Sequence, residues 1–102
     1  MRQEEVLIGA LLEDACLTLE ELSRACAVPP GWVIEHVRDG LLPAPGDSPS
    51  AWRFSSRDLA RARQMLRFER DFDAVPELAA LVADLIEELD DLRAQLRRAG
   101  LT

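Results

Sequence analysis

The hydrophobic positions in the first half of the chain recur at helical spacing in two short runs, which a pair of prolines separates. The first run predicts a helix that begins after Thr18, since threonine commonly caps helix N-termini and acidic residues follow it. Its apolar positions have helical spacing: Leu19, Leu22, Ala25 and Cys26. Pro29 and Pro30 cannot continue this helix, but a proline suits the first turn of the next one. We therefore predict a second helix over Pro30–Asp39, ended by Gly40 as a left-handed cap.

A loop rich in turn-forming residues follows the second helix and leads to a short apolar segment. The loop covers residues 43–50 and holds one acidic residue and no basic residue. We expect a strand near Glu5–Leu11, which contains a short β-prone run, to pair with a wing around Trp52–Phe54. Two helices joined by a short turn and followed by a small β-wing form a winged helix-turn-helix.

The spacing after this segment predicts a longer helix from Ser56 to about Phe72. Its core-facing positions are expected to be Leu59, Ala62, Met65, Leu66 and either Phe68 or Phe72. Arginine side chains run along the same helix: Arg57, Arg61, Arg63, Arg67 and Arg70. This stripe could bind an acidic partner. We favour pairing of the arginines with Glu69, Asp71 and the acidic segments on either side.

A final helix is predicted to begin at Pro76, where the missing N–H costs little, and to stop at Gly100. Its large apolar residues alternate four and three positions apart, which is the heptad pattern of a coiled-coil seam: Leu78, Val82, Leu85, Leu89, Leu92 and Leu96. Leu81 and Ile86 widen this apolar face. Part of the face is therefore expected to pack on the preceding domain.

The order of charges along the final helix favours self-association. Acidic residues come early and basic residues late, so two antiparallel copies would place opposite charges near each other. We predict a weak homodimer in which Leu85, Leu89 and Leu92 contribute to the contact. The chain is thus expected to be mainly α, with a winged helix-turn-helix domain over 1–72 and an amphipathic, coiled-coil-like helix over 73–102.

The net charge limits the class of partner. The chain of 102 residues has 19 acidic and 12 basic side chains, all twelve of them arginine, for a net charge of −7. The helix-turn-helix region over 31–72 has six acidic and seven basic side chains, and the segments before and after it each carry a net charge of −4. DNA-binding domains normally have a clear basic excess, because phosphate contacts supply most of their affinity. Nucleic acid is therefore an unlikely partner.

The sequence contains no pattern that indicates catalysis, a cofactor or a metal site. No glycine-rich phosphate loop, nucleophile with a base, or cluster at metal-ligand spacing is present, so we expect a protein that is not an enzyme. His36 is the only histidine and is interpreted as a packed or surface residue. Cys16 and Cys26 are interpreted as buried apolar thiols. No apolar run could span a membrane and no signal peptide is recognisable, which predicts a cytoplasmic protein.

Several of these segments, in this order, resemble the DNA-binding domain of the MerR transcription regulators. The matching segments are Leu17–Ser23, Gly40–Pro43, Trp52–Phe54 and Ser56–Leu59. MerR regulators typically place arginine and tyrosine midway along the second helix to contact phosphates. This chain has Ile34, Glu35 and His36 there, and a carboxylate repels phosphate. The resemblance therefore implies a MerR-like fold whose DNA contacts are lost.

A MerR-like domain followed by a short acidic heptad helix resembles the CbpM chaperone-modulator family over nearly the whole chain. The resemblance includes the joint from Phe72 to Pro76. It implies binding to the J-domain of CbpA, a DnaJ-like co-chaperone, and inhibition of its action with DnaK. We assign partner binding to Glu35 and Asp39 of the second helix, together with Trp32 and Arg53. The alternative is a MerR-type transcription regulator that contacts DNA through Arg38, Arg53 and the arginine stripe.

Overall fold

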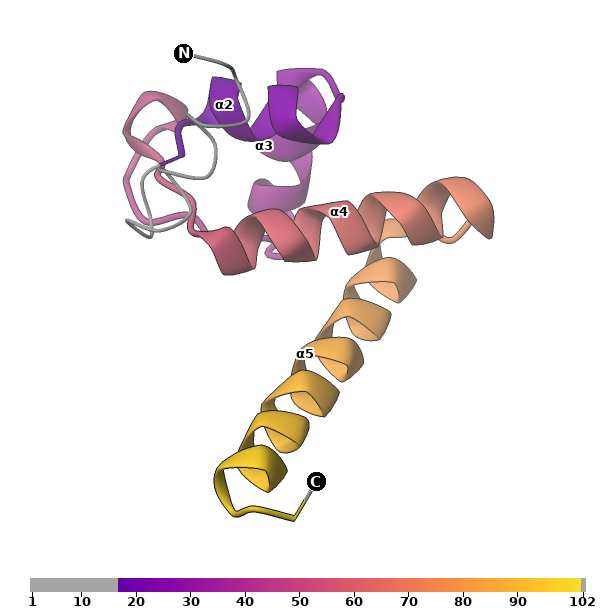
Figure 1. Ribbon diagram of the computed structural model, residues 1–102. Helices are drawn as coiled ribbons and strands as arrows, with labels where there is room; N and C mark the ends of the chain where they lie inside the picture. The colour runs from indigo at the N-terminus through magenta and orange to yellow at the C-terminus, as the bar shows by residue number, and fades with distance from the viewer. Residues whose placement is uncertain (1–16, 102) are drawn as a thin grey trace.

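The computed structural model describes residues 17–101, which form a mainly helical fold built around one long central helix (Figure 1). The elements are α2 (Leu19–Cys26), α3 (Pro30–Arg38), the 3-10 turn η1 (Pro49–Ala51), α4 (Ser56–Asp71) and α5 (Pro76–Arg98). In Figure 1, α2 and α3 lie on one side of α4, and α5 extends from the other side. The strand predicted near Glu5–Leu11 lies outside the described residues.

Capping boxes fix the starts of α2 and α4. The side chain of Thr18 accepts a hydrogen bond from the backbone N–H of Glu21, and the Glu21 carboxylate accepts one from the backbone N–H of Thr18. Ser55 and Asp58 make the same reciprocal pair at α4. Each box satisfies two backbone donors that a helix N-terminus would otherwise leave unpaired. The N-cap predicted at Thr18 is confirmed.

The turn between α2 and α3 follows from the chemistry of its residues. Ala27 ends α2 in the left-handed conformation, with φ of 57°. Pro30 occupies the first helical position of α3, as predicted. Gly40 follows α3 with φ of 77°, which confirms the predicted glycine cap. The two short helices are therefore held in a helix-turn-helix by local backbone preferences.

The predicted β-wing is wrong for the part of the chain that the structure describes, because residues 17–101 contain no β-strand. A single antiparallel bridge joins Leu17 to Phe54, with N···O distances of 3.0 and 2.8 Å. The intervening loop contains Pro43, Pro45 and Pro49, which cannot donate to a β-ladder, and η1 occupies its last part. The bridge still brings the segment before α2 against the segment before α4.

One hydrophobic core lies between α4 and the helix-turn-helix. Its largest fully buried side chains come from every part of this region: Leu22, Val33, Leu42, Phe54 and Met65. On α4, Leu59, Ala62 and Met65 are buried, which confirms the predicted core face. Of the two alternatives at its end, Phe68 packs against the core, whereas 68% of Phe72 is exposed. The core therefore reaches only to the last turn of α4.

Alanines, rather than leucines, bring α5 onto α4. Ala79, Ala80 and Ala83 are buried, and their short side chains allow the two helices to approach closely. Of the two residues expected to widen the apolar face, Ile86 is half-buried, whereas 54% of Leu81 is exposed. The predicted domain boundary between residues 72 and 73 falls in the joint between α4 and α5. Within residues 17–101, no helix is long and apolar enough to cross a membrane.

Candidate partner-binding surfaces

The exposed end of α3 presents two carboxylates. Glu35 lies in the helix and Asp39 caps its C-terminus, and both side chains are exposed. Arg38 lies between them and is also exposed. No ion pair among residues 17–101 involves Glu35 or Asp39. The sequence prediction of an acidic face on this helix is consistent with this placement.

The neighbouring side of α3 is tied to α4 by three side chains that we call the Trp32–His36–Glu69 cluster. Trp32 Nε1 donates to Glu69 Oε1 at 3.2 Å, and His36 Nε2 lies 2.9 Å from Glu69 Oε2. The His36 ring stacks on the Trp32 indole with 3.7 Å between centroids, and its Nδ1 lies 2.6 Å from the Trp32 carbonyl oxygen. His36 is buried, which confirms its interpretation as a packed residue.

This cluster gives Trp32 a structural role, and its part in partner binding stays a prediction. The side chain was predicted to bind a partner, but its indole N–H is already used by Glu69 and one ring face is covered by His36. Trp32 holds α3 on α4 through this bond. It is only half-buried, so the exposed edge of its ring can also contact another protein. The expected pairing of Glu69 with an arginine of α4 is wrong, because its carboxylate is used by Trp32 and His36, which lie 37 and 33 residues away in the sequence.

Arg53, the fourth predicted contact residue, lies in the loop before α4. Its guanidinium donates to the carbonyl oxygens of Ser50 at 3.2 Å and Trp52 at 2.7 Å. Among the described residues, no hydrogen bond joins Arg53 to α3. The part of Arg53 in partner binding stays a prediction.

A network of charges joins α4 to α5 and to the segment after α3. The Arg61 guanidinium donates to Asp84 Oδ1 at 2.6 Å, to Glu87 at 3.2 Å and to the Leu41 carbonyl oxygen at 2.8 Å. Only 12% of its side chain is exposed, so these bonds are shielded from competing water better than a surface pair. Arg57 pairs with Asp91 at 3.0 Å. Arginine pairing with an acidic flanking segment is thus confirmed for Arg57 and Arg61.

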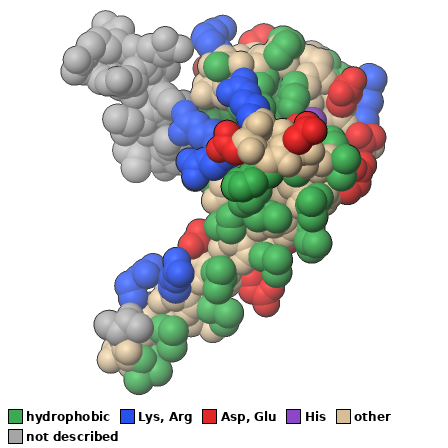
Figure 2. Space-filling model, turned by 90° about the vertical axis from the view of Figure 1, so that its right-hand side faces the viewer, with side chains coloured by type: hydrophobic (Ala, Val, Ile, Leu, Met, Phe, Trp, Pro, Cys, Tyr) green, Lys and Arg blue, Asp and Glu red, His purple; other side chains and the backbone are tan. Residues whose placement is uncertain are grey.

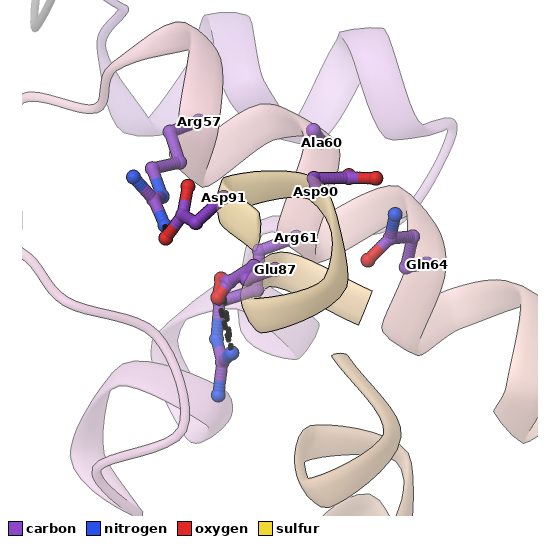
Figure 3. Close-up of a pocket in the computed structure, with 7 residues that line it drawn as sticks. All are labelled: Arg57, Ala60, Arg61, Gln64, Glu87, Asp90 and Asp91. Atoms are coloured by element: carbon purple, nitrogen blue, oxygen red, sulfur yellow. Dashed lines mark hydrogen bonds and ion pairs between the residues drawn. The ribbon is translucent and has the colours of Figure 1, made fainter. Parts of the chain in front are cut away.

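These pairs line a shallow pocket of about 240 Å³ between α4 and α5 (Figure 3). Its lining residues are Arg57, Ala60, Arg61, Gln64, Glu87, Asp90 and Asp91. Two arginines and three acids line it, and two of the acids are already paired, Glu87 with Arg61 and Asp91 with Arg57. We interpret it as part of the helix–helix joint.

The remaining face of α5 carries an exposed row of leucines, which we call the leucine stripe. It consists of Leu78, Leu81, Leu85, Leu89, Leu92 and Leu96, each between 41% and 54% exposed. Figure 2 shows hydrophobic side chains following this helix from the domain to its free end. Exposed apolar patches of this kind mark interaction surfaces in soluble proteins.

The described residues offer little else for chemistry. Within 17–101, no group of three or more His, Cys, Asp or Glu side chains could hold a metal ion. Cys26 is a buried free thiol, and desolvation raises its pKa while nearby Arg63 opposes the shift. A protonated buried thiol packs as a small hydrophobic group. The interpretation of Cys26 is confirmed, and Cys16 lies outside the described residues.

Comparison with known proteins assigns nearly all of the described part of the chain to one family. Residues 17–99 match the family described as MerR HTH family regulatory protein. A chaperone modulatory protein, CbpM, from Coxiella burnetii is 30% identical over 92% of this chain and 90% of its own length. A protein of the same name from Pseudomonas entomophila is 28% identical over 78% of each chain. No solved structure gives a significant match.

Proposed function

This chain belongs to the MerR-like family of CbpM chaperone modulatory proteins, and on that premise we propose that it binds the J-domain of a CbpA- or DnaJ-like co-chaperone and inhibits it. It acts in this proposal as a binding module without catalysis. The observation that carries the proposal is the pair of exposed carboxylates at the C-terminal end of α3, Glu35 and Asp39. They occupy the helix that reads DNA in MerR regulators, where a phosphate-binding surface requires basic groups.

Charge complementarity supports a basic protein partner. J-domains present a basic helix to DnaK, and a chain with a net charge of −7 attracts such a surface. Occupying that helix would block access of DnaK, which accounts for inhibition without any chemical step. Complementary charges mainly accelerate encounter and select the partner, whereas a few packed side chains supply most of the binding energy. The half-buried edge of Trp32, next to the acidic end of α3, is the packed contact that we propose.

Calorimetric titration of this chain with a purified J-domain at low salt tests the proposal. We expect heat of binding, and an affinity that falls as salt screens the opposite charges. The absence of any heat in a concentrated low-salt titration would contradict the proposed function.

Charge reversal on α3 tests the surface. Glu35→Lys and Asp39→Lys should each weaken J-domain binding roughly tenfold, the equivalent of about 1.4 kcal/mol. Asp47→Lys is the matched control, because it makes the same change in net charge in an exposed loop away from α3. Equal effects at all three positions would mean that net charge, and not the α3 surface, governs binding.

A further inference from the structure

The joint between α4 and α5 exposes an aromatic side chain. Among the five aromatic residues of the chain, all of which lie within residues 17–101, only Phe72 is exposed, with 68% of its surface accessible. Val75, three positions further on, is 60% exposed. We call these two side chains the joint patch. The side of the molecule that carries the joint faces the viewer in Figure 2, which shows hydrophobic side chains with acidic ones close by.

The backbone of the joint holds this patch in a fixed position. The N–H groups of Phe72 and Ala74 both donate to the Phe68 carbonyl oxygen, at 3.1 and 3.4 Å. The Phe72 ring stacks on the Phe68 ring with 5.3 Å between centroids, and Phe68 packs against the core. A side chain that is held in place before binding loses less conformational entropy when a partner covers it.

Two residues of the joint do not suit the local backbone well. Asp73 has φ of 51°, a left-handed conformation that glycine adopts at less cost. Val75 is the N-cap of α5 and makes no side-chain cap hydrogen bond, whereas a serine there would accept one from the first turn of the helix. Departures from local preference are expected at functional sites. Contact with a partner therefore explains these two side chains better than the needs of the helix do.

Acidic residues flank the joint patch. Asp71 ends α4, Asp73 lies in the joint and Glu77 is in the first turn of α5, and all three are exposed. No ion pair in the described part of the chain involves them. Residues 70–77 hold one basic residue, Arg70, against these three acids. An apolar anchor with acids at its rim fits a partner surface that carries an apolar side chain between basic ones.

The joint patch adjoins the part of α3 to which we assign J-domain binding. Residues three positions apart are neighbours on a helix surface, which places Phe72 beside Glu69. The Glu69 carboxylate in turn accepts from the Trp32 indole N–H at 3.2 Å. Trp32 and Phe72 therefore both adjoin Glu69, at the end of α4 that carries α3. A partner that covers the exposed edge of Trp32 is close enough to reach Phe72.

We propose that the joint patch is an apolar anchor for the basic helix of the J-domain, in addition to the edge of Trp32. This inference rests on the proposed function and adds a contact to it. An apolar side chain of the J-domain helix packs on Phe72 and Val75, while its basic side chains lie next to the acids of the joint. Aromatic anchors supply more of the binding energy of an interface than the charges at its rim do.

Calorimetric titration of the full chain with a purified J-domain tests this anchor. We expect Phe72→Ser to weaken binding at least about tenfold, because it removes the aromatic contact. Leu101→Ser is the matched control, since 70% of Leu101 is exposed beyond the end of α5, and it should bind as wild type. Equal affinities of wild type and Phe72→Ser would overturn the anchor and leave J-domain binding in place. A wild-type chain that gives no heat would contradict the proposed function as well as the anchor.

Val75→Ser separates a role in binding from a role in the fold. A serine at this N-cap can accept a hydrogen bond from the start of α5, so the urea midpoint should stay at the wild-type value or rise. The affinity for the J-domain should nevertheless fall, by about threefold, because the patch loses apolar surface. A lower urea midpoint with unchanged affinity would mean that Val75 serves only the fold, and would overturn its place in the patch.

Sedimentation tests the alternative occupant, a second copy of this chain. Phe72→Ser and wild type should have the same mass at equal concentration, and circular dichroism should show equal helix content, which excludes unfolding as the cause of weaker binding. A changed mass of Phe72→Ser together with wild-type affinity for the J-domain would mean that a second copy covers the joint patch. That result would overturn the proposal.

Discussion

At the scale of single residues, one carboxylate determines how α3 lies on the rest of the fold. Glu69 is half-buried in the last part of α4, and each of its oxygens accepts from a different side chain of α3. Hydrogen bonds to charged acceptors are stronger than neutral ones, particularly where water is partly excluded. The position of the α3 carboxylates relative to a partner therefore depends on Glu69.

Removal of this carboxylate is expected to destabilise the fold. Glu69→Ala leaves the Trp32 indole N–H and the buried His36 ring without their acceptor, which should lower the free energy of unfolding by about 2 kcal/mol. Urea denaturation measures this loss. Asp71→Ala is the control: it removes an exposed carboxylate from the same helix end and should leave stability nearly unchanged. A similar loss in both variants would show that the cluster contributes nothing specific.

The Cys26 thiol gives a second prediction at this scale. Burial raises the pKa of Cys26 in the folded chain, so the native state holds its proton to higher pH than the unfolded state does. Stability contributed by this group is therefore present below the unfolded pKa and is lost as pH rises above it. In a Cys16→Ser background, iodoacetamide should alkylate native Cys26 slowly and urea-unfolded Cys26 quickly. Equal rates would contradict the burial of this thiol.

At the scale of elements, α5 is a helix with two apolar faces of different size. The alanine face allows close approach to α4, and the leucine stripe on the other side remains exposed. Arg61 and Arg57 add polar contacts from α4 along the edge between these faces. Helix direction is therefore set by small side chains and by a shielded arginine, not by the heptad leucines.

Enlarging one alanine should disturb this joint. Ala83→Leu adds volume where no space is available and is expected to cost about 2 kcal/mol of unfolding free energy. Chemical denaturation followed by circular dichroism measures the effect. Ala99→Leu, at the exposed C-cap of the same helix, should be close to neutral. If Ala83→Leu were equally neutral, the α4–α5 contact would not be closely packed in solution.

At the scale of the whole molecule, the arrangement of charge separates this chain from a DNA-binding regulator. The fold retains the helix-turn-helix, but two arginines of the predicted stripe are engaged by acids of α5. The helix that would enter the major groove exposes carboxylates at its free end. The helix-turn-helix fold therefore does not by itself determine what the chain binds. The charges exposed on its surface do.

This arrangement of charge predicts that the chain does not bind duplex DNA specifically. A MerR-type regulator that used Arg38, Arg53 and the exposed arginines of α4 would retard DNA at low salt, with an affinity that falls steeply as salt rises. We expect no mobility shift under those conditions. A salt-dependent shift abolished by Arg38→Ala, but not by the leucine-stripe variant Leu89→Asp, would favour the regulator instead.

The sequence by itself determined the features that depend on near neighbours in the chain. The Thr18 N-cap, the proline start of α3, the Gly40 cap and the extent of α4 follow from backbone preferences within a few residues, and all are confirmed. The resemblance to MerR-like chaperone modulators also rests on short segments in a fixed order, and family comparison confirms it.

Only the tertiary structure decided which side chains distant in sequence meet. The pairing of Glu69 with Trp32 and His36, and of Arg61 with Asp84 and the Leu41 carbonyl, depends on the packing of separate helices. The heptad pattern identified an apolar face on α5. It could not show that the alanines, and not the leucines, would pack against α4. Close packing favours the small residues there, because α4 can approach them most nearly, and this leaves the leucines outside.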